Sequence, residues 1–92
     1  MSLLNRVIVY FLAICETRNL ARAAKALGVT QPAVSLQVRA LEKRLGTQLL
    51  DRSGRRVEPT EAGLRLFRGA QRLLQLEEQI LDEVASDGAG AL

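Results

Sequence analysis

Residues 19–46, which read NLARAAKALGVTQPAVSLQVRALEKRLG, carry the pattern that decides the fold. Asn19 is a good N-cap for a helix over 20–27, whose apolar side is rich in alanine and therefore allows its neighbours to approach closely. Gly28 follows at the position where a helix C-cap residue in the left-handed backbone conformation is expected. Thr30 can act as the N-cap of a further helix. The stretch therefore predicts two helices joined by a tight turn.

The second of these helices should cover residues 31–45 and end at Gly46. Pro32 fits its first turn, where the backbone N–H has no partner within the helix. At 100° per residue the helix has an inward stripe formed by Val34, Val38, Leu41 and Leu45. The opposite face carries Pro32, Leu36, Arg39 and Lys43, with Ser35 on its shoulder. Leu36 is the unusual member of this face, although isolated surface leucines are common.

Two further elements complete a small body. A helix over 3–16 has a wide apolar face made by Leu4, Val7, Ile8, Phe11, Leu12 and Cys15. Two short extended segments, 48–52 and 57–59, flank a turn that contains Gly54 and predict a small hairpin with Arg55 and Arg56 at its tip. A hairpin this short must pack against the helices, because it cannot fold alone.

A last helix is expected over 60–86, with Thr60 as its cap and Glu61 in its first turn. It would be about 39 Å long, so part of it must project from the body. Its two apolar stripes exceed what one small body can cover, and this predicts a homodimer. The stripes consist of Leu66, Leu73, Leu76 and Ile80, and of Phe67, Ala70, Leu74, Leu81 and Val84. Residues 87–92 are expected to form a flexible stub.

The composition indicates one domain and a polyanionic partner. The chain has 92 residues, of which 48% are hydrophobic, enough for one core and too few for a multidomain enzyme. All thirteen basic residues lie at or before Arg72, together with five of the ten acids, so residues 1–72 carry +8 and the remaining twenty carry −5. This asymmetry favours nucleic acid over an anionic membrane surface as the partner.

The residues needed for most enzyme mechanisms are missing. There is no histidine and a single cysteine, Cys15, so the sequence predicts no metal site, no cofactor and no catalytic pair. No glycine-rich phosphate loop is present. The lone cysteine excludes an internal disulfide and fits a cytoplasmic protein. The apolar run 7–15 is far below the ~18 residues that span a membrane. A binding module, and not an enzyme, is expected.

Two helices around a glycine turn, with a polar face on the second, are typical of a helix-turn-helix that enters the DNA major groove. Gln31 can contact adenine through two hydrogen bonds, and Ser35 can form a hydrogen bond with almost any base edge. Pro32 and Leu36 can touch a thymine methyl group. Arg39 and Lys43 are better placed for phosphates, and the hairpin arginines suit the backbone or the minor groove. A helical protein-binding module is the alternative, but it leaves the basic body unexplained.

The stretch 20–46, followed by LLDRSGRR at 49–56 and TEAG at 60–63, strongly resembles the amino-terminal domain of LysR-type transcriptional regulators. The resemblance covers about residues 4–86. It implies a mainly α fold, a winged helix-turn-helix of three helices and a short two-stranded wing, followed by a long linker helix that pairs two subunits. It also implies a missing carboxy-terminal domain that binds a small effector, and an intact protein that is a dimer or a tetramer.

By position, Gln31, Pro32 and Ser35 match the base-reading residues of this family, and Arg55 or Arg56 matches its wing arginine. Leu36 departs from the family, where arginine is frequent, and this favours a thymine contact there over a guanine contact. Arg52 can equally contact DNA or form a structural ion pair. The expected organisation is a DNA-binding domain over 1–59, a dimerisation helix over 60–86 and a stub over 87–92. The residues expected to contact DNA are Thr30, Gln31, Pro32, Ser35, Leu36, Arg39, Lys43, Arg55 and Arg56.

Overall fold

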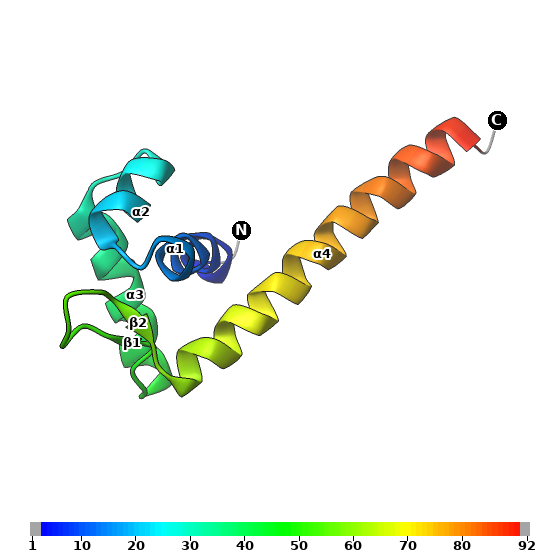
Figure 1. Ribbon diagram of the computed structural model, residues 1–92. Coiled ribbons are helices and arrows are strands. Elements are labelled where there is room, and N and C mark those ends of the chain that lie inside the picture. Colours follow the sequence, from blue (N-terminus) through cyan, green and yellow to red (C-terminus); the bar gives the residue numbers. More distant parts are fainter. Residues whose placement is uncertain (1–2, 91–92) are drawn as a thin grey trace.

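The computed structural model describes the backbone of residues 3–90 and the side chains of residues 6–86. Over this range the chain is mainly helical and carries one small antiparallel sheet (Figure 1), as the sequence predicts for a winged helix-turn-helix. The elements are α1 (Leu3–Thr17), α2 (Leu20–Leu27), α3 (Gln31–Leu45), β1 (Leu50–Asp51), β2 (Glu58–Pro59) and α4 (Glu61–Gly90).

The core forms where α1 packs against α2 and α3. Phe11 and Ile14 of α1 are fully buried, and Ala23 and Ala24 of α2 let the helices approach closely, as expected from their small side chains. The predicted apolar face of α1 is confirmed over the residues whose side chains are described, which exclude Leu4. Ile14 is an addition to that face. The main buried cluster comprises Val7, Phe11, Ile14, Ala23, Ala24, Val34, Val38, Leu41, Leu49 and Leu50.

The turn between α2 and α3 has the predicted caps. The side chain of Asn19 accepts a hydrogen bond from the backbone N–H of Arg22 at 2.9 Å. Gly28 is left-handed (φ 70°), a conformation that costs glycine little, and the N–H of Val29 donates to the carbonyl of Ala24 at 3.0 Å. The hydroxyl of Thr30 accepts from the N–H of Ala33 at 3.3 Å. These contacts fix the angle at which α3 leaves α2.

The inward stripe of α3 is shorter than the sequence predicts. Val34, Val38 and Leu41 are buried, but Leu45 is 54% exposed. The core cluster ends at Leu41, and the chain turns at Gly46 directly after Leu45. The side chain of Leu45 therefore lies outside the core, and the expectation that it belongs to the inward stripe is wrong.

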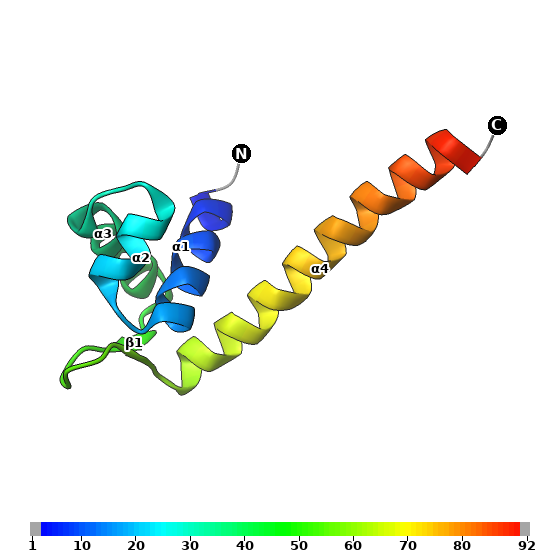
Figure 2. The same cartoon turned by 45° about the horizontal axis from the view of Figure 1, so that its top comes forward.

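The predicted hairpin is present as a wing with very short strands. Leu50 pairs with Pro59 and Asp51 pairs with Glu58 in an antiparallel register. Leu49 and Leu50 are buried in the core cluster, which anchors the first strand to the helices, whereas the loop between the strands projects from the body (Figure 2).

The start of α4 is fixed against the wing. The hydroxyl of Thr60 accepts from the N–H of Gly63 at 3.0 Å and donates to the carbonyl of Gln48 at 2.6 Å. A Cβ at Gly63 would overlap the carbonyl oxygen of Leu49 and lie 3.2 Å from the ring of Phe11. Only a glycine leaves room for so close an approach of helix and strand.

Beyond its first turns α4 leaves the body. Ala70 is buried against Ile8 and Leu12 of α1, and α4 then extends freely away from α1 (Figures 1 and 2). The described chain measures 56 × 26 × 22 Å, with a radius of gyration of 15.6 Å, against about 12 Å for a compact chain of this length.

The helix also continues further than predicted, to Gly90 and not to about Ser86. No proline follows Ser86 to stop it, and glycine and alanine near a helix end are tolerated. The first part of the expected stub is thus helical, and residues 91 and 92 lie outside the described range.

Candidate nucleic-acid interface

The exposed side of α3 carries the predicted base-reading and phosphate residues. Gln31, Pro32, Arg39 and Lys43 are exposed, and Ser35 is half-buried on the shoulder of this face. Leu36 is 66% exposed, a large value for an apolar side chain in the middle of a helix. The buried stripe of α3 holds the opposite side in the core. The helix therefore presents an amide, a hydroxyl and apolar groups near its start and cations further along.

Thr30 has a structural role in addition to its expected contact. Its hydroxyl oxygen accepts the N–H of Ala33, which leaves the hydroxyl proton free for another acceptor. Because the cap fixes the first turn of α3, Thr30 also positions Gln31 and Pro32.

The wing tip is exposed and basic. Arg55 and Arg56 are both exposed and lie in the loop between β1 and β2. Asp51 closes the base of this loop: its Oδ1 accepts from the N–H of Ser53 at 2.9 Å and from the hydroxyl of Ser53 at 2.6 Å. These hydrogen bonds hold the pKa of the Asp51 carboxyl below its ordinary value.

Arg52, for which the sequence allowed two roles, forms an ion pair within the protein. Its Nη1 lies 3.4 Å from Oε1 of Glu42, and its side chain is 22% exposed. Glu42 also accepts backbone hydrogen bonds from Leu49 and Leu50. The sequence reasoning did not single out Glu42. The available signal was one acid on a helix whose neighbouring charges, Arg39, Lys43 and Arg44, are all basic.

Two basic residues of α2 add to the positive surface of the helix-turn-helix. Arg22 and Lys25 are exposed, and the sequence pattern did not predict them as contacts. Only the charge count of the body pointed to them, because neither belongs to the recognition pattern of α3.

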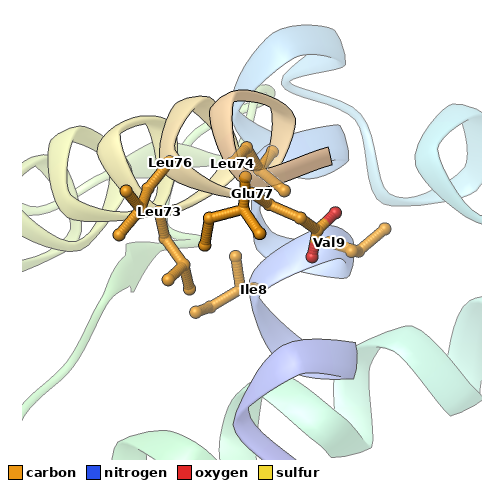
Figure 3. Close-up of a pocket in the computed structure, with 7 residues that line it drawn as sticks. Ile8, Val9, Leu73, Leu74, Leu76 and Glu77 are labelled. Carbon is orange, nitrogen blue, oxygen red and sulfur yellow. The ribbon is translucent and has the colours of Figure 1, made fainter. Parts of the chain in front are cut away.

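A second surface, apolar in character, lies along the projecting part of α4. Leu73, Leu76, Ile80, Leu81 and Val84 are between 43% and 67% exposed. A groove of about 380 Å³ runs between α1 and α4 and is lined by Ile8, Val9, Leu73, Leu74, Leu76, Glu77 and Ile80 (Figure 3). Val9, which is 45% exposed, was not predicted to belong to this surface.

One residue of the predicted dimerisation set is covered within its own chain. Ala70 is only 1% exposed, because it packs against Ile8 and Leu12 of its own chain. Leu66, Phe67 and Leu74 are half-buried for the same reason, since they pack against the core clusters. Apart from Leu64 near the start of α4, which is 40% exposed, the exposed large apolar side chains described on this helix begin at Leu73.

Cys15 is a half-buried free thiol. Burial raises its pKa to about 11, although the nearby Arg18 acts in the opposite direction. Among the described residues no three potential metal ligands come together, and none of the described helices has the length and hydropathy needed to cross a membrane.

Comparison with known proteins identifies close relatives of this arrangement. Residues 6–64 match the family described as bacterial regulatory helix-turn-helix protein, lysR family. The chain is 40% identical over 85 residues to the HTH-type transcriptional regulator BudR of Klebsiella aerogenes. The aligned region covers 92% of this chain and 59% of that protein. It is 41% identical over 87 residues to a hydrogen peroxide-inducible genes activator of Dickeya chrysanthemi. This aligned region covers 95% of this chain and 28% of that protein. The chain thus spans only part of these relatives.

Solved structures are similar over nearly the whole chain. The DNA-binding domain of BenM in complex with benA site 1 DNA superimposes with a TM-score of 0.87 at 34% identity, covering 98% of this chain and 99% of that one. The DNA-binding domain of CbnR in complex with DNA gives a TM-score of 0.82 at 40% identity, covering 96% and 99%.

Proposed function

The chain belongs to the LysR family of bacterial regulatory helix-turn-helix proteins, and from this premise we propose that it is the sequence-specific, double-stranded DNA-binding part of a transcriptional regulator. In this proposal α3 enters the major groove, the wing contacts the backbone or the minor groove, and two copies bind together. The observation that carries it is the exposed side of α3, where Gln31, Pro32 and Leu36 precede Arg39 and Lys43.

Each residue of that face has a role that follows from its chemistry. The Gln31 amide offers a donor and an acceptor that match adenine, and Leu36 offers an apolar contact for a thymine methyl. Arg39 and Lys43 neutralise phosphates and carry no sequence information. Arg55 and Arg56 of the wing are exposed on a loop that projects from the body, which suits contacts with the backbone beside the groove.

The apolar surface of α4 supports a homodimer. Five large apolar side chains between Leu73 and Val84 are at least 43% exposed, and contiguous surface of this kind marks an interaction site. After Glu61 in its first turn, the charges of α4 are divided along its length. Arg65, Arg68 and Arg72 lie in its first half, and Glu77, Glu78, Asp82 and Glu83 lie in its second half.

This division favours antiparallel pairing of α4 with a second copy of itself. In an antiparallel pair the basic first half of one helix lies beside the acidic second half of the other. A parallel arrangement would place like charges together, which is unfavourable. A two-fold dimer presents its recognition helices in opposite directions, so the proposed site is an interrupted inverted repeat.

The remaining expectations concern the intact protein. Because the relatives are longer than this chain, we propose a carboxy-terminal domain that binds a small effector and a cytoplasmic dimer or tetramer as the working form.

In vitro selection of bound duplexes from a random pool tests the proposed function. The expected result is an enriched motif with two inverted half-sites. Binding to mixed-sequence DNA should weaken steeply with salt, since each neutralised phosphate contributes a slope of about −0.9 in log K against log salt. Failure to enrich any motif, together with binding to mixed-sequence DNA that does not depend on salt, would instead favour a protein-binding helical module.

A further inference from the structure

We propose that Glu42 is a positioning residue that holds the wing in register with the recognition helix, and that Arg52 serves this contact and does not bind DNA. The proposal rests on the proposed function, because it concerns how the two DNA-binding elements are aligned. It starts from a carboxylate that is nearly buried on an otherwise basic helix.

Glu42 joins α3 to the wing through both of its oxygens. Oε2 accepts hydrogen bonds from the backbone N–H of Leu49 at 2.7 Å and of Leu50 at 3.1 Å. Oε1 lies 3.4 Å from both Nη1 and Nη2 of Arg52. The Glu42 side chain is 11% exposed, so water screens these interactions only weakly. Hydrogen bonds to an ionised carboxylate are about twice as strong as neutral ones.

The wing needs such an anchor because its sheet is very small. Each strand has two residues, and an isolated hairpin of this size is not stable in water. Leu49 and Leu50 are buried, so their N–H groups need an acceptor inside the protein. The Glu42 carboxylate supplies that acceptor. It thereby ties the start of the wing to the last turn of α3.

Arg52 is oriented by the same contact. Its Nη atoms face Glu42, and its Nε is buried without a hydrogen-bond partner among the described residues. A guanidinium that bound phosphate would be expected to keep its donors exposed. Arg55 and Arg56 follow within the same loop and are exposed, so they remain the wing residues proposed for DNA.

The other strand is held by weaker contacts. The N–H of Val57 donates to the carbonyl of Arg18 at 3.3 Å, and Arg18 forms an ion pair with Glu58 at 3.3 Å. The side chains of this pair are 50% and 45% exposed, and such surface pairs contribute little. Glu58 therefore provides a matched control, a wing carboxylate whose loss changes the net charge by the same amount.

The test compares Glu42→Gln with Glu58→Gln on one fixed mixed-sequence duplex, each with and without the double replacement Arg55→Ala and Arg56→Ala. In the wild type and in Glu58→Gln, removal of the two arginines should raise Kd by about tenfold or more. This is the effect of losing one or two charge-assisted hydrogen bonds. In Glu42→Gln the same removal should raise Kd by less than about threefold, because the wing is no longer aligned with α3. Equal losses in all three backgrounds would overturn the proposal.

Amide hydrogen exchange of the free protein gives a readout that does not depend on DNA. Glu42→Gln should accelerate exchange at Leu49 and Leu50 while leaving Val34 and Val38 of α3 protected, and Glu58→Gln should do neither. If the wild type binds no duplex but these changes occur, the proposed function fails and the contact between α3 and the wing stands. Unchanged exchange at Leu49 and Leu50 would contradict the contact itself.

A second variant covers the case in which Glu42→Gln does not fold. Arg52→Gln removes the ion pair but leaves the bonds from Leu49 and Leu50 to Glu42 in place. The slope of log K against log salt should stay the same, because no phosphate contact is lost. A slope shallower by about one unit would assign Arg52 to the DNA and overturn its positioning role.

Discussion

At the scale of single residues, Gly63 sets how closely α4 approaches the wing. Its missing side chain leaves room for the carbonyl oxygen of Leu49 and the ring of Phe11. Sequence alone suggested only that Gly63 lies within a helix, where glycine is normally unfavourable by about 1 kcal/mol relative to alanine. The tertiary contact reverses that expectation.

We predict that Gly63→Ala lowers the free energy of unfolding by about 1–3 kcal/mol, because the new Cβ must displace backbone atoms. Gly69→Ala is the matched control on the same helix. A Cβ there would lie 3.6 Å from the flexible end of Arg72, and the better helix propensity of alanine should stabilise the protein by about 0.5–1 kcal/mol. Urea unfolding followed by circular dichroism measures both. Stabilisation by Gly63→Ala would contradict the packing described.

Leu36 is an exposed apolar residue in the middle of α3, and we expect the base preference to depend on it. We predict that Leu36→Arg moves the preference at one half-site position from thymine towards guanine, because the arginine fork matches the two acceptors of guanine. Titration of duplexes that differ at each position measures the change. Ala40→Arg, which adds the same charge on the same helix, should raise affinity without this change of preference. An unchanged preference in Leu36→Arg would remove Leu36 from the interface.

At the scale of elements, the residues of α3 proposed to contact bases and those proposed to contact phosphates lie at different positions along the helix. Gln31 lies in the first turn, and Arg39 lies two turns later on the exposed side. The caps at Thr30 and Gly46, predicted from residue type and spacing, define both ends of this helix. Local hydrogen bonding determines such caps, which is why the sequence predicted them well.

We predict that Gln31→Ala relaxes the base preference at one base pair. The binding free energy should fall by about 1–3 kcal/mol on the selected site and little on mixed-sequence DNA. Arg39→Ala should weaken both duplexes equally and make the salt slope shallower by about one unit, because it removes a phosphate contact. Binding isotherms at several salt concentrations distinguish the two effects. Equal weakening of both duplexes by Gln31→Ala would exclude it from base reading.

At the scale of the whole molecule, the described side chains of the long helix pack against the body near its start and are exposed further along. The part of α4 up to Ala70 and Leu74 packs against α1, whereas the part beyond exposes Leu76, Ile80 and Val84. A helix with an exposed apolar stripe and segregated charges is expected to pair with a second copy.

We predict that Leu73→Glu combined with Ile80→Glu shifts the protein from dimer to monomer and weakens binding to the inverted repeat, because one domain then holds only one half-site. Sedimentation at micromolar concentration measures the first effect, and titration of full and half sites measures the second. Gln75→Glu with Gln79→Glu adds the same charge to exposed positions without removing apolar surface, and should leave most of the dimer intact. A wild-type protein that stays monomeric both free and on DNA would contradict the proposal.

The sequence by itself determined the helices, the caps, the glycine turn, the wing and the exposed face of α3, because each depends on residues close together in the chain. Only the tertiary structure decided which residues of α4 the body covers, that Leu45 is exposed, and that Gly63 touches Leu49. It also decided that Arg52 pairs with Glu42. These outcomes depend on where elements distant in sequence come into contact, and the pattern within one helix or one strand does not contain that information.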